Sequence, residues 1–297
     1  MCIRDRCYIS DSVDKSVLKR MRKLIQSIDV DALTMNIESL AECMFTHKWI
    51  NPFPKFKYSE RPDTATAAIL DGNIVIMVDN SPAVMIIPAS IFDIIEEADD
   101  FNFSPIIGSY LRITRFFFSI VTWILTPLWL LFVNNPDWVP EFLKFILITD
   151  DITVPVLLQL LILELAVDGL KLAAVNTPTM LSTPLSIVAG IVVGEYAVSS
   201  GWFNPEALLY MAVVTVGTYG QTNFEMGYAF KFLRVLMLIL TQIFNLAGFI
   251  TGVVISVLMI AFNRTITGKS YIYPLIPWDG KMLKRKVFRV RLPHGFK

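Results

Sequence analysis

The sequence has little histidine, and the scarcity limits its chemistry. Only two histidines occur, His47 and His294, far apart in the chain. A histidine metal site or a histidine-based catalytic triad is therefore not expected. The signature residues of phosphate-binding loops, dinucleotide-binding folds, zinc proteases and esterase elbows are also missing. We therefore expect neither an enzyme nor a bound cofactor or metal.

Cysteine is scarce too. Cys2, Cys7 and Cys43 are odd in number and lack Cys-x-x-Cys spacing, so free thiols in a reducing compartment are expected. The first six residues are charged and no apolar run follows them, so no secretory signal is recognised. We therefore expect the N-terminal part to stay in the cytoplasm.

Charge is sparse between residues 116 and 262, where long apolar segments follow one another. A helix needs about 20 apolar residues to cross about 30 Å of hydrocarbon. Three segments reach this length and two fall short. With 54% hydrophobic residues and a mean hydropathy of +0.56, the composition is that of an integral membrane protein. The five segments are 113–133, 153–175, 184–199, 207–219 and 233–262.

The charge pattern divides the chain into four parts. We predict an α-helical integral membrane domain, residues 113–262, preceded by a small cytoplasmic α/β domain. That domain consists of a helical part, residues 1–50, and an α/β module, residues 51–112. A basic tail, residues 263–297, follows the membrane domain.

Local signals predict the elements of the N-terminal domain. Apolar residues at helical spacing predict two helices, over 13–28, capped by Asp11 or Ser12, and over 31–44. A third helix runs from a cap at Asp63 to Leu70, before Gly72. Two apolar runs, 73–79 and 83–88, predict a β-hairpin. Ser90 and Asp93 match a capping box for a helix ending near residue 98.

The positions of basic residues predict the topology. Arg112 and Arg115 precede the first apolar segment, and the tail after Asn263 has nine Lys or Arg against one acidic residue. By the positive-inside rule both flanks are cytoplasmic. Five full crossings would violate this parity. Either segment 233–262 folds back near residues 245–248, or one segment enters and leaves on the same side, so we predict a broken or re-entrant element.

The second apolar segment carries three ionisable residues on one face. Glu164, Asp168 and Lys171 lie at positions i, i+4 and i+7, and Glu195 lies in the next segment. Each such group costs about 2.5–3.5 kcal/mol in lipid, so the stripe must face protein or water. One hypothesis is that the carboxylates, with Lys171 beside them, line a cation path. The alternative is that Asp168 pairs with Lys171 and the other groups stabilise helix packing.

Two small-residue motifs suit close helix packing. They are Gly190-x-x-x-Gly194 and Gly248-x-x-x-Gly252, and such spacing allows helices to approach closely, within or between subunits. The basic run at residues 281–286 lies beside a predicted span. We expect this run to contact anionic lipid headgroups rather than nucleic acid.

Scattered motifs give the chain a family resemblance. It resembles the A-subunit family of spore germination receptors, whose members have an ERPD turn, a helix ending in glycine and a strand ending in VDG or VDN before a membrane domain. Residues 78–85 look closer to the stage V sporulation protein AF branch. Because family members usually have a longer soluble region, we expect this chain to be truncated at its N-terminus. The matching positions are Glu60-Arg61-Pro62-Asp63, Leu70-Asp71-Gly72, Val78-Asp79-Asn80-Ser81-Pro82, Phe224-Glu225, Arg234 and Tyr273-Pro274-Leu275-Ile276-Pro277.

The resemblance implies a function. The A subunits of this family are expected to assemble into a homo-oligomeric channel for monovalent cations in the spore inner membrane. Each subunit would be multi-pass, with both termini cytoplasmic. Expected partners are membrane lipid and other germination membrane proteins, either permease-like and lipoprotein subunits or a small membrane partner. The alternative is a non-conducting scaffold that docks those partners. The sequence indicates neither the trigger nor a nutrient pocket.

Overall fold

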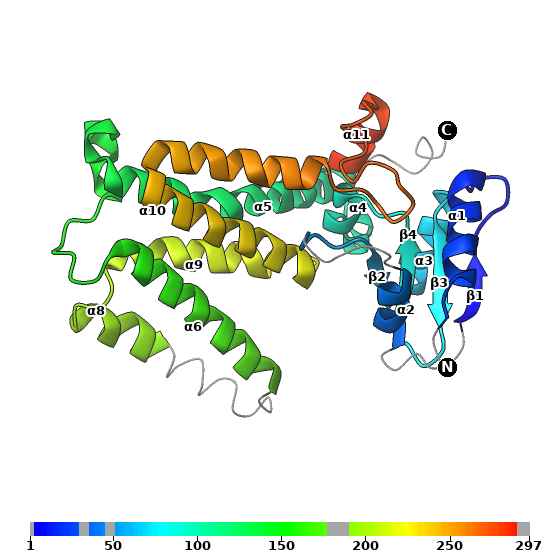
Figure 1. Cartoon of the computed structure of the whole chain (residues 1–297), viewed down its shortest axis with the longest axis horizontal. Helices are drawn as coiled ribbons and strands as arrows, with labels where there is room; N and C mark the ends of the chain where they lie inside the picture. Colours follow the sequence, from blue (N-terminus) through cyan, green and yellow to red (C-terminus); the bar gives the residue numbers. More distant parts are fainter. Residues whose placement is uncertain (1–2, 30–35, 45–50, 177–189, 290–297) are drawn as a thin grey trace. The chain divides into compact units, whose positions relative to one another are not determined.

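A computed structural model describes residues 3–29, 36–44, 51–176 and 190–289 (Figure 1). The chain forms two compact units. Unit 1 comprises residues Met1–Phe116, Thr222–Met226 and Val257–Lys297, and unit 2 comprises Phe117–Gln221 and Gly227–Ser256. The two longest helices, α5 (Pro105–Asn134) and α10 (Phe224–Ala261), each contribute to both units.

Unit 1 contains a four-stranded antiparallel sheet with the strand order β1-β3-β4-β2. The central hairpin pairs Ile74 with Ile87, as the two apolar runs predicted. Asn80 in its turn has a φ of 57°, a left-handed conformation that asparagine tolerates. The two edge strands were not predicted, because they are short and lack an alternating apolar pattern. The strands are β1 (Ile3–Cys7), β2 (Lys57–Ser59), β3 (Ile74–Val78) and β4 (Val84–Ile87).

Helices α1 (Lys15–Gln26) and α2 (Asn36–Met44) cover one face of this sheet (Figure 1). Alternate strand residues face them, and the helical stripes complete the core. One core therefore joins the predicted helical part to the predicted α/β module. The buried residues of this core include Val17, Met21, Leu40, Met44, Ile74, Ile76, Met85 and Ile87.

Two predicted helix starts are wrong. Helix α1 begins after Asp14, whose carboxylate accepts from the Ser16 amide, so neither Asp11 nor Ser12 is its cap. Helix α3 (Pro62–Leu70) begins after Arg61. Proline at the first helical position has no amide that needs a cap. Asp63 therefore lies inside the first turn, where it pairs with Arg61.

The predicted capping box is confirmed at helix α4 (Ile91–Ile95). The Ser90 amide donates to the Asp93 carboxylate and the Asp93 amide donates to the Ser90 hydroxyl. The helix ends at Ile95, earlier than predicted, and a short 3-10 helix, η1 (Ala98–Asn102), follows.

The segment after α10 packs within unit 1. The Ile91 amide donates to the carbonyl of Tyr271 over 3.0 Å, and Tyr271 is fully buried. Helix α11 (Gly280–Val287) follows, with Asp279 accepting from the amides of its first turn. At least residues 257–289 of the chain are thus part of this folded unit.

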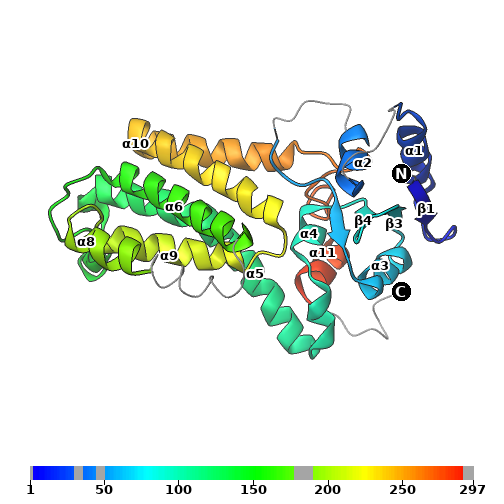
Figure 2. The same ribbon diagram turned by 90° about the horizontal axis from the view of Figure 1, so that it is seen from below.

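Unit 2 is helical. Helices α6 (Val156–Asn176) and α9 (Pro205–Tyr219) run beside one another (Figure 2). They share an apolar core that includes Trp129, Leu130, Leu160, Leu163, Met211 and Leu238. Short elements connect the helices: η2 (Pro136–Trp138), η3 (Glu141–Ile146), the π-helix η4 (Gly190–Tyr196) and α8 (Ala197–Ser199).

Helix α10 reverses direction at Asn245, whose φ of 52° and ψ of −129° are not helical. The two arms therefore meet at Asn245 and return past one another (Figures 1 and 2). A Cβ atom at Gly248 would collide with the carbonyl oxygen of Leu240, and one at Gly252 would lie 2.7 Å from Met237 Cγ. The reversal lies in the stretch 245–248 that the parity argument identified.

Two of the described helices are long and apolar enough to cross a membrane. They are α5, with 30 residues, and α10, with 38 residues. Because α10 is a hairpin, it provides two consecutive arms rather than one long crossing.

Candidate functional site

The acidic stripe of α6 meets two basic residues of α10 inside unit 2. Arg234 donates from Nε to Oε1 of Glu164, and these side chains are 3% and 6% exposed. Lys231 lies one turn earlier on α10, with its Nζ 3.5 Å from Oε2 of Glu164. Glu164 is therefore held by two cations.

Asp168 pairs with Lys231, through its Oδ2 atom. Its other oxygen, Oδ1, is buried and accepts no hydrogen bond from a described residue. The side chain is still 23% exposed. Asp168 thus combines one fixed ion pair with one uncommitted carboxylate oxygen.

Arg234 also ties α5 into this network. Its Nη1 donates to the backbone carbonyl of Thr122, which is completely buried. The Thr122 hydroxyl in turn accepts from Nε2 of Gln221 over 3.1 Å. One guanidinium therefore joins three helices, α5, α6 and α10.

Lys171 lies on the same helix but has different neighbours. Its Nζ is 5.3 Å from the ring centre of Tyr219 and 5.6 Å from that of Tyr228. Two aromatic faces stabilise a cation at this distance. Within the described residues Asp168 pairs with Lys231, so the pairing with Lys171 that the sequence suggested is not observed.

Glu195 and the glycine motifs are on other elements. Glu195 lies on η4 with an exposed side chain, and the described contacts do not bring it to Glu164 or Asp168. Gly190 and Gly194, also on η4, have open space around them, whereas Gly248 and Gly252 contact the other arm of α10.

The sequence pattern alone did not reveal the basic half of this network. This half consists of Lys231 and Arg234. They are three residues apart, so on a helix they share a face, and Glu164 and Asp168 share one by the same rule. Two charges of each sign, spaced three or four residues apart on two apolar helices, were the available signal.

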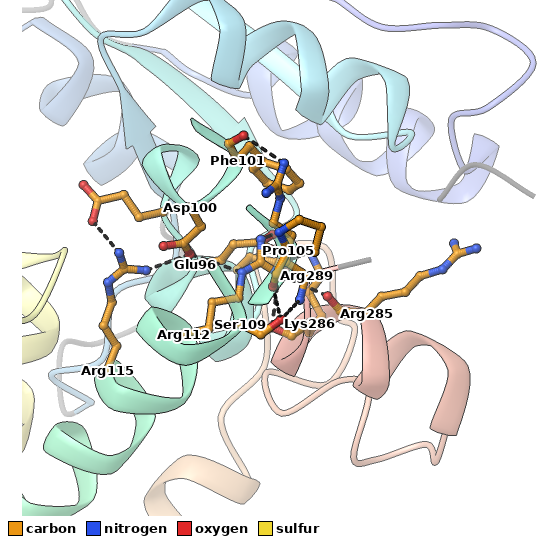
Figure 3. Close-up of polar contacts among 12 residues, drawn as sticks. Glu96, Asp100, Phe101, Pro105, Ser109, Arg112, Arg115, Arg285, Lys286 and Arg289 are labelled. Atoms are coloured by element: carbon orange, nitrogen blue, oxygen red, sulfur yellow. Dashed lines mark hydrogen bonds and ion pairs between the residues drawn. The ribbon is translucent and has the colours of Figure 1, made fainter. Parts of the chain in front are cut away.

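A second charged cluster lies in unit 1 (Figure 3). Arg112 is only 2% exposed; it donates from Nη2 to Glu96 over 2.6 Å and from Nε to Asp100 over 3.1 Å. Its Nη1 also donates to the carbonyl of Arg285, on α11. Arg115 binds the same Asp100 oxygen over 2.7 Å. The first turns of α5 are thereby fixed to η1 and α11.

Lys286 secures α11 from the other side of this cluster. Its Nζ lies 2.6 Å from Asp93 and 3.0 Å from Glu96. Burial alone would raise the pKa of Asp93, but Lys286 and Ser90 outweigh it and lower the pKa below 3.8. Burial would lower the pKa of Lys286, but the two carboxylates raise it well above 10.5. Both partners are charged at neutral pH.

Comparison with known proteins identifies the family to which the chain is similar. The family model for the Bacillus/Clostridium GerA spore germination protein matches residues 5–296. The chain is 35% identical over 287 residues to stage V sporulation protein AF of Bacillus subtilis (strain 168), covering 97% of this chain and 58% of that protein. It is 26% identical over 288 residues to spore germination protein KA of the same strain, covering 95% and 52%.

A third relative is described as a membrane protein. The uncharacterized membrane protein YfkQ of Bacillus subtilis (strain 168) is 26% identical over 256 residues, covering 84% of this chain and 49% of that protein. The chain thus spans about half the length of the curated relatives it matches. No solved structure is significantly similar to it. The family match over nearly the whole sequence confirms the resemblance deduced from the scattered motifs, and the chain belongs to the GerA family of spore germination proteins.

Proposed function

We propose that this chain is a multi-pass membrane subunit of a spore germination complex and that copies of it assemble around a path for monovalent cations. The conducting role is supported by one observation, the carboxylate oxygen of Asp168 that has no partner among the described residues. Its Oδ1 is buried and accepts no hydrogen bond from the described residues, while the rest of its side chain is partly exposed on an apolar helix. A carboxylate oxygen of this kind replaces part of the hydration shell of a passing cation.

The acidic residues then have different roles. Glu164 is bound by Arg234 and Lys231 and is almost fully buried, so it holds α6 to α10. Asp168 keeps one oxygen for a cation, and Lys231 beside it limits how tightly a cation is held. Glu195, exposed on η4, would meet the path only through another element or copy.

The reversal of α10 supports a topology with both termini in the cytoplasm. A first arm of 21 residues, 224–244, rises about 32 Å, and a second arm of 16 residues, 246–261, rises about 24 Å. Two arms in place of one raise the number of apolar segments from five to six, which is an even number. The basic flanks at Arg112 and in the tail then both lie on the cytoplasmic side of the spore inner membrane.

A second function has its own supporting observation. Glu164 and Asp168 face Arg234 and Lys231, two anionic against two cationic groups. A neutralised network of this kind also suits a non-conducting scaffold that docks permease-like and lipoprotein subunits, or a small membrane partner. In that case the network would only stabilise the fold.

Ion flux distinguishes the two functions. The full chain is reconstituted in liposomes, and K⁺ and Na⁺ efflux is measured for the wild type, for Asp168→Asn and for Glu195→Gln at matched protein levels. Glu141→Gln is the matched control, because its side chain on η3 is 94% exposed. We expect the wild type to conduct and Asp168→Asn to change the K⁺/Na⁺ ratio, with the control unchanged. Tight liposomes with correctly folded wild type would reject the channel in favour of the scaffold.

A further inference from the structure

The loop before α11 exposes an unusual run of apolar side chains. Leu275, Ile276 and Trp278 are 40%, 57% and 71% exposed. The loop is held in place, because the Leu275 amide donates to the carbonyl of Ile272 over 2.8 Å and the Asp279 amide donates to that of Pro274 over 2.9 Å. This hydrogen-bonded loop thus presents three apolar side chains that the described residues leave largely exposed.

A basic helical face follows directly. Lys281 and Lys284 on α11 are exposed. With about 100° of rotation per residue, they lie about 140° and 160° around the helix from Lys286. Lys286 points inward to Asp93 and Glu96, so these two lysines point outward. The inward pairing fixes which face of α11 remains available.

The cluster in Figure 3 attaches α11, which follows this loop, to the first turns of α5. Arg112 on α5 donates to the carbonyl of Arg285, and the Arg289 amide donates to Oγ of Ser109 over 3.0 Å. Helix α11 is thereby attached to the first turns of α5, just before the apolar stretch that is long enough to cross a membrane. The headgroup layer would lie at this level.

We propose that Leu275, Ile276, Trp278, Lys281 and Lys284 form an anchor surface that inserts into the interfacial layer of an anionic membrane. Tryptophan and aliphatic side chains enter the boundary between headgroups and acyl chains. The two lysines bind the phosphate groups of anionic lipids, each contributing about a fivefold gain in affinity. The inference rests on the proposed membrane location, and it adds a lipid class that unit 1 recognises.

The test follows the depth of the loop in vesicles. The full chain carries Ile276→Cys, labelled with an environment-sensitive fluorophore, and serine in place of Cys2, Cys7 and Cys43. It is reconstituted into phosphatidylcholine vesicles, with or without phosphatidylglycerol, and bromine-labelled lipid chains serve as quencher. We expect a blue-shifted emission and strong quenching with phosphatidylglycerol, and reversal of both by high salt.

Charge variants test the role of the lysines. In Lys281→Gln with Lys284→Gln, the affinity of the loop for phosphatidylglycerol should fall about 25-fold, so half-maximal quenching should need a higher phosphatidylglycerol content. The matched control is Lys15→Gln with Lys19→Gln, two exposed lysines on α1, which should leave quenching unchanged. Trp278→Ser provides an independent variant that should lower quenching without altering the charge.

Three outcomes would overturn the anchor. Quenching that is the same with and without phosphatidylglycerol, and unchanged when both lysines are replaced, would exclude recognition of anionic lipid. A fluorophore shielded only at high protein-to-lipid ratio would indicate a contact between copies of the chain. A fluorophore left in water while the protein floats with vesicles would refute the anchor alone, whereas failure to float would refute the membrane location itself.

Discussion

Arg234 on α10 and Glu164 on α6 form an ion pair in which both side chains are more than nine-tenths buried. The same guanidinium donates to the carbonyl of Thr122 on α5. A buried charge without its partner is costly, whereas removal of both charges is often tolerated. The pair therefore connects three helices only while both members are present.

Replacing one member of this ion pair should destabilise unit 2 more than replacing both. We expect Glu164→Leu or Arg234→Leu alone to lower the free energy of unfolding by about 3–5 kcal/mol, and the double variant to recover much of that loss. Thermal unfolding in detergent measures all three, with Glu195→Leu as the exposed control. Additive losses in the double variant would show that the two side chains act independently.

Closing of the α10 hairpin should depend on Gly248. A Cβ atom there meets the carbonyl oxygen of Leu240, which belongs to the backbone and cannot move aside. We expect Gly248→Ala to cost about 1–3 kcal/mol through overpacking, measured by thermal unfolding. Gly190→Ala and Gly194→Ala are matched controls, because nothing lies within 4 Å of the added atom. Equal losses at all three positions would contradict the close approach of the arms.

Attachment of α11 should depend on Lys286 rather than on its exposed lysines. Lys286→Met leaves the carboxylate of Asp93 without its cation and Glu96 with Arg112 alone, so we expect local unfolding of α11 to become easier by about 3 kcal/mol. Hydrogen exchange of the α11 amides measures this change. Lys284→Met on the exposed face should have little effect, and equal effects would refute the inward role of Lys286.

The ion pair of Asp93 and Lys286 predicts that the local stability of α11 does not change with pH around neutrality. The pKa of Asp93 is lowered in the folded state, so its contribution is complete above about pH 4 and is lost as pH falls through the lowered value. The pKa of Lys286 is raised, so its contribution is complete below about pH 10 and is lost as pH rises through the raised value. Hydrogen exchange of α11, corrected for its intrinsic pH dependence, should be constant between these limits. A step near neutral pH would indicate another titrating group.

Lys55 should lose its proton at a lower pH than an ordinary lysine. Burial lowers its pKa from 10.5 to about 8, although its Nζ donates to the carbonyl of Arg264 over 2.7 Å. The unfolded chain then binds more protons between these values, so the free energy of unfolding should rise with pH across that window. We expect less than about 1 kcal/mol, because the side chain is only partly buried. Lys55→Met should abolish the rise, and NMR titration of dimethylated lysines locates the group directly.

Local signals were sufficient where neighbouring residues decide the structure. The hairpin of β3 and β4 and the capping box of Ser90 and Asp93 depend on contacts between residues close in sequence. By contrast, β1 was missed because it becomes a strand only through pairing with β3, far along the chain. Proline at position 62 decided the start of α3, and the interpretation of Asp63 as a cap overlooked it.

The sequence by itself determined the family, the apolar segments and the acidic stripe of α6, because periodicity, segment length and motif order are all properties of the linear chain. It also left two alternatives: either segment 233–262 folds back near residues 245–248, or one segment enters and leaves on the same side. Only the tertiary structure decided that α10 reverses at Asn245 and that Lys231, not Lys171, pairs with Asp168. The physical reason is that a charge in an apolar helix must find a partner, but any helix that packs nearby can supply it.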